Sequence, residues 1–128
     1  MKQYQIIEPE SMHDSFVFNI IDQNYPVGYA NLINDNGAIK LADIYIYDHA
    51  HAKSTLARWF KKLRGRKNYR DKGVGTCFLK RIIKFCKNKG TKKIYGELVD
   101  DIPRLKKWYQ SLGFTIDTTN KIELDLSD

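Results

Sequence analysis

Cysteines are scarce in this sequence, and long apolar runs are missing from it. Its 128 residues contain only two cysteines, Cys77 and Cys86, too few for a disulfide framework. If both lie on one helix, they sit about 13 Å apart along its axis, whereas a disulfide needs Cα atoms within about 7 Å. No apolar run approaches the ~18 residues of a membrane-spanning helix. These absences favour a cytoplasmic protein in a reducing environment, without a membrane partner.

Acidic side chains are almost absent from the segment 53–93. This segment holds 16 of the 22 lysines and arginines but only one acid, Asp71, and therefore carries a formal charge of +15. The remaining 87 residues carry 6 basic and 14 acidic side chains, a charge of −8. A positive block of this size has to face water, a polyanion or an acidic partner.

The apolar pattern changes from period 2 to period 3.6 near residue 54, which predicts a mixed α/β (α+β) domain. At 128 residues and 42% hydrophobic content, we expect one domain, 1–128, with its own core. Strands are expected at 2–8, 15–21, 27–33, 38–47, 92–99, 114–116 and 122–126. Helices are expected at 54–64, at 74–86, and from a cap at Asp100 or Asp101 to Gly113. The fourth strand is expected to be buried on both faces, and both cysteines are expected in the core.

A glycine-containing loop, Arg70-Asp71-Lys72-Gly73-Val74-Gly75, precedes the second predicted helix. Glycines let the backbone approach a ligand closely, and the free N–H groups of a helix's first turn attract anions. The pattern therefore predicts a diphosphate site. It is not a P-loop, because no Gly-Lys-Ser/Thr closes it. It is also a poor dinucleotide fingerprint, because Phe78 stands where a third small residue belongs.

This loop resembles the coenzyme A pyrophosphate loop of the GNAT N-acetyltransferase superfamily, Arg/Gln-x-x-Gly-x-Gly/Ala. A second stretch, Leu105 to Phe114, reads LKKWYQSLGF and is similar to the family's signature Leu/Phe-Tyr-x-x-x-Gly-Phe. The two motifs are about as far apart as is usual in the family, and the resemblance spans residues 15–126. It implies the GNAT fold, a mixed, mostly antiparallel twisted sheet whose fourth and fifth strands splay apart between flanking helices.

By this resemblance, the chain takes acetyl-CoA and an amine acceptor as its partners. The backbone amides of the loop are expected to hold the pyrophosphate of coenzyme A, with participation of Arg70, Asp71, Lys72, Gly73, Val74, Gly75 and Thr76. The fourth strand, around Ile44 and Ile46, is expected to pair with the pantetheine arm like an added strand. The implied reaction is direct attack of a neutral amine on the thioester.

Direct attack needs a base for the amine's proton and an acid for the leaving thiolate. Tyr109 matches the family's usual acid, although its helical spacing alone would make it a core residue. Glu97, near the end of the fifth predicted strand, is our choice of base. Asp100, Asp48 and His49 are alternatives, and water can also carry the proton.

The sequence departs from the family at three places. Only residues 9–14 join the first two strands, where the family has two helices that wall the acceptor side. Residues 49–69 are inserted before the loop, and we hypothesise that the predicted helix 54–64 partly replaces the missing wall. The family's frequent Asn is Ile102 here. An open acceptor side fits a protein side chain, an N-terminus or a small polyamine, and it makes a homodimer plausible.

Two other functions stay open at the level of sequence. The +15 block exceeds what the phosphates of one coenzyme need, which favours a nucleic-acid-binding module. Against this, the aromatic residues of 54–64 fall on its apolar face and do not alternate with basic residues. A degenerate fold that binds acyl-CoA without catalysis is the third possibility. His49 and His51 have no third ligand assigned, so no metal site is expected.

Overall fold

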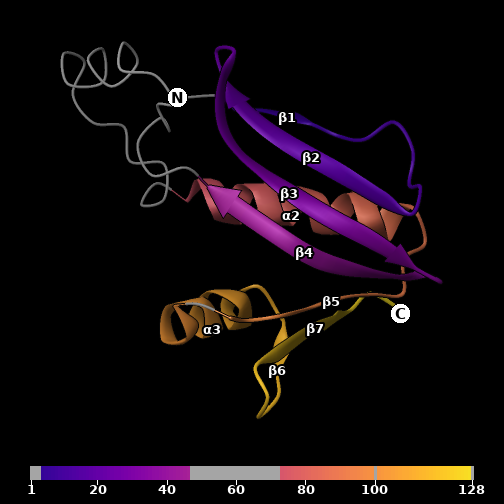
Figure 1. The fold of residues 1–128 in the computed structure, drawn as a ribbon, viewed down its shortest axis with the longest axis vertical. Coiled ribbons are helices and arrows are strands. Elements are labelled where there is room, and N and C mark those ends of the chain that lie inside the picture. Colours follow the sequence, from indigo (N-terminus) through magenta and orange to yellow (C-terminus); the bar gives the residue numbers. More distant parts are fainter. Residues whose placement is uncertain (1–3, 47–72, 100, 128) are drawn as a thin grey trace.

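The computed structural model describes residues 4–46, 73–99 and 101–127 (Figure 1). The strands are β1 Gln5–Ile7, β2 Ser15–Asp22, β3 Tyr25–Asp35, β4 Ala38–Ile46, β5 Lys93–Glu97, β6 Thr115–Ile116 and β7 Lys121–Asp125. The helices are α2 Val74–Asn88 and α3 Ile102–Ser111. These elements closely follow the predicted ones. The predicted helix over 54–64, and with it the hypothesis that it replaces the missing wall, lies outside the described residues.

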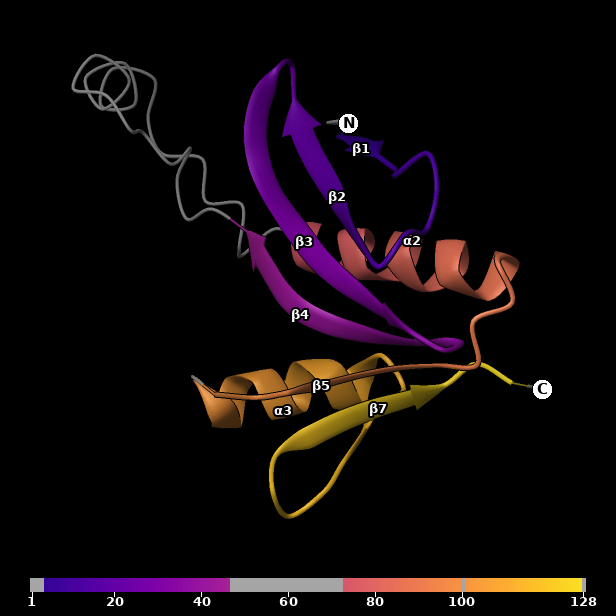
Figure 2. The ribbon, with the colours of Figure 1, turned by 45° about the vertical axis from the view of Figure 1, so that its right-hand side comes forward.

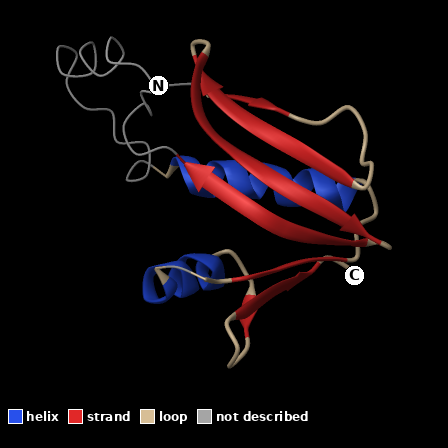
Figure 3. Ribbon diagram, viewed as in Figure 1, coloured by secondary structure: helices blue, strands red, loops and turns tan. Residues whose placement is uncertain are grey.

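The strands form one seven-stranded sheet in the order β1-β2-β3-β4-β5-β7-β6. Every neighbouring pair is antiparallel except β4 and β5, which are parallel. Two parallel neighbours need a crossover connection, and α2 lies in the connection between β4 and β5 (Figure 3). The architecture confirms the predicted α+β class, a mixed, mostly antiparallel sheet with helices packed on it.

The core lies between the helices and one face of the sheet. Phe16, Phe18 and Ile20 point to this face from alternate positions of β2, and each is at most 5% exposed. The apolar stripe of α2 packs on them: the ring centroid of Phe18 lies 6.5 Å from that of Phe78 and 5.0 Å from that of Phe85. Side chains of α3 join the same apolar cluster, so both helices share one core.

The other face of the sheet, called the outer face below, carries no helix in the part of the chain that the structure describes (Figure 2). Val17 of β2 and Ile33 of β3 lie on it and are 45% and 41% exposed. The connection 8–14 between β1 and β2 is short and contains no helix, as the sequence indicated. Among the described residues, the outer face of β1 to β3 thus exposes part of its apolar surface, as one face of an antiparallel sheet commonly does.

The strands β4 and β5 pair only near their beginnings and then diverge. Pairing covers Ala38–Lys40 of β4 and Lys93–Tyr95 of β5, whereas β4 itself continues to Ile46. Figure 2 shows the two strands running apart toward their carboxyl ends. The predicted splay of the fourth and fifth strands is thereby confirmed, and it leaves one edge of β4 without a strand partner.

A bulge in β4 accounts for this divergence. Leu41 pairs with Leu32 of β3 and Asp43 with Asn31, so Ala42 is an extra residue without a partner. A bulge bends its strand and increases its twist, which carries the end of β4 away from β5. The bulge also explains why the predicted burial of this strand on both faces was wrong. Ile44, Tyr45 and Ile46, which follow the bulge, are only partly buried, and among the described residues β5 pairs with β4 no farther than Lys40.

Close approach of β3 to the end of β4 depends on Gly28. A Cβ atom at this position would lie 2.4 Å from the carbonyl oxygen of Tyr45 and 2.8 Å from Cδ1 of Ile46. Substitution Gly28→Ala is therefore expected to lower the free energy of unfolding by about 1–3 kcal/mol, because the backbone of β4 has to move. Urea unfolding measures this loss. Gly75→Ala is the control, since its Cβ meets no atom closer than 3.4 Å, and equal stability of the two variants would contradict the expectation.

Two details of the helices differ from prediction. Cys86 is buried as expected, but Cys77 is exposed, because it lies at the solvent side of the apolar stripe of α2. Asp101 occupies the cap position of α3, yet its side chain makes no capping hydrogen bond and instead pairs with Arg104.

Candidate active site

The beginning of α2 presents unpaired backbone N–H groups. Gly73 precedes the helix with φ +72°, a left-handed conformation that suits glycine, and no side chain caps this end. The first intrahelical bond runs from the N–H of Cys77 to the oxygen of Gly73, so the N–H groups of Val74, Gly75 and Thr76 precede it. The first turn has no acidic residue, and the helix dipole adds positive potential there. This end can therefore hold an anion; Arg70, Asp71 and Lys72 lie outside the described residues.

The end of β4 lies beside this helix end. An ideal Cβ on Gly75 would lie 3.6 Å from Cγ1 of Ile46, and both Ile44 and Ile46 pack against the core. Beyond Lys40 the edge of β4 toward β5 has no strand partner among the described residues. A strand edge that does not pair with a neighbouring strand can offer N–H and C=O groups, here around Ile44, to an extended ligand. The structure thus brings the two predicted parts of the coenzyme site together.

Trp108 of α3 joins the two helices at this point. Its indole Nε1 donates a hydrogen bond to Oγ1 of Thr76 over 2.9 Å, and its ring lies 3.4 Å from the ideal Cβ of Gly75. Sequence reasoning assigned Trp108 only to the apolar face of its helix, because the partner of its indole N–H, Thr76, is brought close only by the tertiary fold. Trp108 therefore fixes α3 against the first turn of α2.

Tyr109 follows Trp108 and is buried on the core side of the sheet. It is 4% exposed, and its ring centroid lies 5.2 Å from that of Phe114 and 4.8 Å from that of Trp108. Burial raises the pKa of its phenol to about 12. Among the described residues, its hydroxyl has no hydrogen-bond partner. A buried hydroxyl without a partner is unusual in proteins, so the group is available to a ligand.

Glu97 is the last residue of β5 and is exposed. Ile94 and Gly96 of the same strand are buried on the core side, so alternation places Glu97 on the outer face. Tyr109 on the core side and Glu97 on the outer face therefore lie on opposite sides of the sheet. The alternative bases Asp48, His49 and Asp100 lie outside the described residues.

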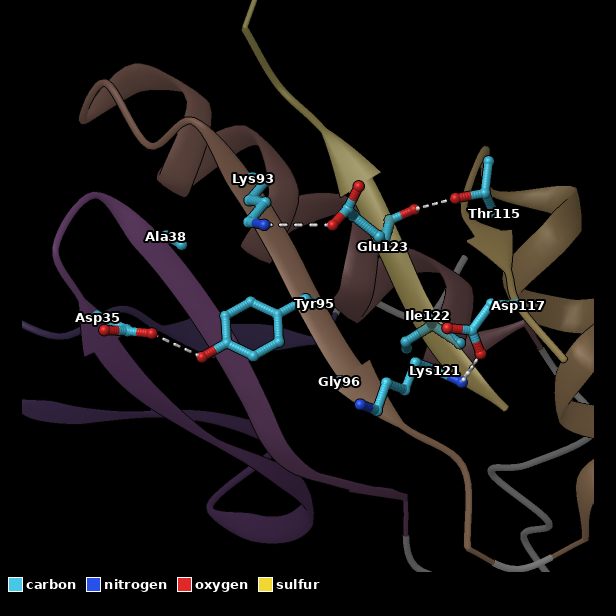
Figure 4. A pocket seen from close by; sticks show the side chains of 10 residues that line it. All are labelled: Asp35, Ala38, Lys93, Tyr95, Gly96, Thr115, Asp117, Lys121, Ile122 and Glu123. Atoms are coloured by element: carbon cyan, nitrogen blue, oxygen red, sulfur yellow. Dashed lines mark hydrogen bonds and ion pairs between the residues drawn. The ribbon is translucent and has the colours of Figure 1, made fainter. Parts of the chain in front are cut away.

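A pocket of about 470 Å³ opens on the same outer face (Figure 4). It is lined by Asp35, Ala38, Lys93, Tyr95, Gly96, Thr115, Asp117, Lys121, Ile122 and Glu123. The hydroxyl of Tyr95 donates a hydrogen bond to Oδ2 of Asp35 over 2.9 Å, and Nζ of Lys93 lies 3.3 Å from Oε1 of Glu123. The pocket ends at Gly96, the residue before Glu97 in the chain, so it adjoins the outer side of the candidate site.

Neither described helix has the length or apolar composition to span a membrane. Within the described residues, no three His, Cys, Asp or Glu side chains cluster as metal ligands. The pair His49 and His51 lies outside them.

Burial of Cys86 and Tyr109 predicts that the fold loses stability at alkaline pH. Burial raises the pKa of Cys86 from 9.0 to about 12, and that of Tyr109 from 10.0 to about 12. Both stabilising contributions are complete below pH 9 and are lost as the pH rises toward 12, because the unfolded chain releases these protons first. The unfolding temperature is expected to fall steadily from pH 9 to pH 11, and less steeply in Cys86→Ala. A flat profile over this interval would contradict the assignment.

Comparison with known proteins places this arrangement in a family. The model of the acetyltransferase (GNAT) family matches residues 2–114. No curated protein matches the chain. Solved structures with the same fold include the ribosomal-protein-S18-alanine N-acetyltransferase from Escherichia coli, with a TM-score of 0.67 and 14% identity over 92% of this chain and 73% of that one.

Two further structures share the fold. The PaiA N-acetyltransferase from Thermoplasma acidophilum, in complex with coenzyme A, has a TM-score of 0.64 and 16% identity over 88% of this chain. This chain spans 61% of that protein's length. A GNAT-family acetyltransferase from Staphylococcus aureus Mu50 has a TM-score of 0.63 and 18% identity over 89% of this chain and 69% of that one. Because the family model covers most of the sequence, the chain belongs to the GNAT acetyltransferase family.

Proposed function

We propose that this protein transfers the acetyl group of acetyl-CoA to a primary amine by direct attack. The observation that carries the proposal is the buried hydroxyl of Tyr109, which has no partner among the described residues. It belongs to α3, the helix that Trp108 ties to the anion-attracting first turn of α2. The end of β4 lies beside the same turn, with Ile46 close to Gly75.

The residues present fit coenzyme A. Its pyrophosphate needs backbone N–H groups and positive potential, which the start of α2 offers through residues 73–76; Arg70, Asp71 and Lys72 complete the proposed loop. Its pantetheine arm carries amide groups that can pair with β4 around Ile44 and Ile46, beyond Lys40, where β4 no longer pairs with β5. Acetyl-CoA supplies the thioester, an acyl group already activated for transfer.

Two side chains act as base and hydrogen-bond donor in the proposed reaction. Glu97 accepts a proton from the amine as the nitrogen–carbon bond forms. Tyr109 donates to the sulfur as the carbon–sulfur bond breaks, either as a hydrogen bond or as a proton. Because burial raises the pKa of Tyr109 to about 12, this phenol stays protonated and can donate a hydrogen bond to the sulfur throughout the physiological range. The same shift disfavours complete transfer of its proton, because a thiolate is the weaker base.

The outer face, which carries no helix among the described residues, supports an acceptor that is not enclosed, such as an N-terminus, a lysine side chain of a protein, or a polyamine. One solved structure with this fold is a ribosomal-protein-S18-alanine N-acetyltransferase, a name that specifies an alanine acceptor in a protein. A peptide with a free N-terminal alanine is therefore a first acceptor to test for this chain.

Release of free thiol from acetyl-CoA tests the proposal. The purified protein is incubated with acetyl-CoA and, in parallel, with an N-terminal alanine peptide, an N-terminally blocked lysine peptide and spermidine. We expect thiol release that depends on at least one amine. Binding of acetyl-CoA without turnover on any of them would favour the degenerate fold and contradict an acetyltransferase activity.

A further inference from the structure

The solvent side of α2 carries a stripe of positive charge that the coenzyme site does not use. The helix contains Lys80, Arg81, Lys84 and Lys87, all exposed, and no acidic residue. Lys84 lies ten residues after Val74, which places it about 15 Å along the helix axis from the first turn. The phosphates of a ligand at the first turn are thus distant from most of this stripe.

This stripe reduces the stability of the helix in isolation. Lys80 and Lys84 are spaced i,i+4, and Lys84 also lies i,i+3 from both Arg81 and Lys87, so like charges are neighbours. Each such pair costs roughly 0.2–0.5 kcal/mol. Only Lys87 lies in the last turn, where the helix dipole favours a cation.

Ion pairs among the described residues compensate little of the charge of Lys80, Arg81 and Lys84. A guanidinium nitrogen of Arg81 lies 3.7 Å from Oε2 of Glu8, but the two side chains are 49% and 39% exposed. Such exposed ion pairs contribute only about 0–1 kcal/mol to stability. Lys80 and Lys84 form no ion pair with any residue that the structure describes. A row of exposed, mutually repelling cations is suited to an external polyanion.

From this stripe we infer that α2 binds the phosphate backbone of a nucleic-acid duplex, in addition to the function proposed above. The choice of a duplex follows from the aromatic residues. Phe78 and Phe85 of α2 are buried, and no aromatic side chain stands among the exposed positions of the helix. Single strands are held largely by bases stacked on aromatic rings, whereas regularly spaced duplex phosphates need only cations.

The expected binding is independent of base sequence and sensitive to salt. Three phosphate contacts, from Lys80, Arg81 and Lys84, would give a slope of about −2.7 in a plot of log affinity against log salt concentration. Positioning by phosphate contacts alone carries no base readout, so unrelated duplex sequences should bind equally.

Fluorescence anisotropy with labelled 20-base-pair DNA and RNA duplexes between 50 and 200 mM NaCl tests this inference on the full chain. In Lys80→Gln/Lys84→Gln, the slope should decrease in magnitude by about 2, and affinity at 50 mM NaCl should fall about tenfold. The matched control is Lys40→Gln/Lys107→Gln, two exposed lysines outside α2, which should bind as the wild type does. The duplex preferred, DNA or RNA, identifies the source of the phosphates.

Three outcomes would overturn the inference. The first is the absence of duplex binding at 50 mM NaCl. The second is binding whose slope the double variant leaves unchanged, which would assign it to the nine lysines and arginines of 53–72. The third is tighter, salt-resistant binding of a single strand. Acetyl-CoA should still raise the unfolding temperature of the double variant, because its substitutions lie outside the proposed coenzyme site, so failure of this inference is distinguishable from failure of the proposed function.

Discussion

Substitution Tyr109→Phe is expected to lower kcat by about 10²–10⁴-fold without lowering the unfolding temperature. The activity falls because the proposed donor to the leaving sulfur is lost. The stability holds because the hydroxyl of Tyr109 has no hydrogen-bond partner among the described residues, so its removal breaks no described bond and relieves the burial of a polar group. Steady-state thiol release and thermal unfolding of the purified variant measure the two effects.

Tyr95→Phe is the matched control for this substitution. Tyr95 is also a tyrosine near the site, but its hydroxyl donates to Asp35 at the protein surface and takes no part in the proposed chemistry. This variant should keep its activity. Full activity in Tyr109→Phe, or equal losses in both variants, would remove Tyr109 from the mechanism.

Substitution Glu97→Gln is expected to lower kcat/KM by about 10²–10³-fold, because a neutral amide cannot take the proton of the attacking amine. The affinity for acetyl-CoA should stay unchanged, since Glu97 belongs to β5 and the proposed contacts to the coenzyme come from β4 and the first turn of α2. Raising the pH should recover part of the activity, because more of the acceptor amine is then already neutral. A pH profile of kcat/KM for both proteins measures this.

The control for Glu97→Gln is Glu123→Gln. Glu123 is exposed on the neighbouring strand β7 and pairs in register with Tyr95, two residues before Glu97. It has the same charge and faces the same side, but it lies farther from the end of β5. Unchanged kinetics in Glu97→Gln would leave proton transfer to water, and equal losses in both variants would point to a general effect of charge.

Local patterns in the sequence were enough for most elements of the fold. Apolar residues alternate with polar ones in 15–21 and recur every 3.6 residues in 74–86. Both patterns are local to the chain, so β2 and α2 could be predicted. The turn chemistry of Gly73 also acts locally, and its positive φ agrees with the predicted close approach of a ligand.

Features that depend on contacts between distant segments escaped prediction. Ala42 has no local signal for a bulge, because the extra residue is defined only by the register between β3 and β4. Trp108 reads as an apolar helix residue until Thr76 is placed beside its indole N–H. Cys77 is exposed because of the way α2 packs on the sheet. The helical period does not contain this information, and it therefore wrongly placed Cys77 in the core.

Stabilisation by acetyl-CoA tests most directly whether the first turn of α2 binds the coenzyme. At a ligand concentration 100-fold above Kd, the wild type should gain about 2.7 kcal/mol of stability, seen as a higher unfolding temperature. Gly73→Glu should lose this gain, whereas Gly90→Glu should keep it. The pair is matched, because Gly73 and Gly90 have φ of +72° and +82° and neither position has an atom within 4 Å of an added Cβ. No stabilisation of the wild type, or equal stabilisation of both variants, would contradict a coenzyme site at this helix end.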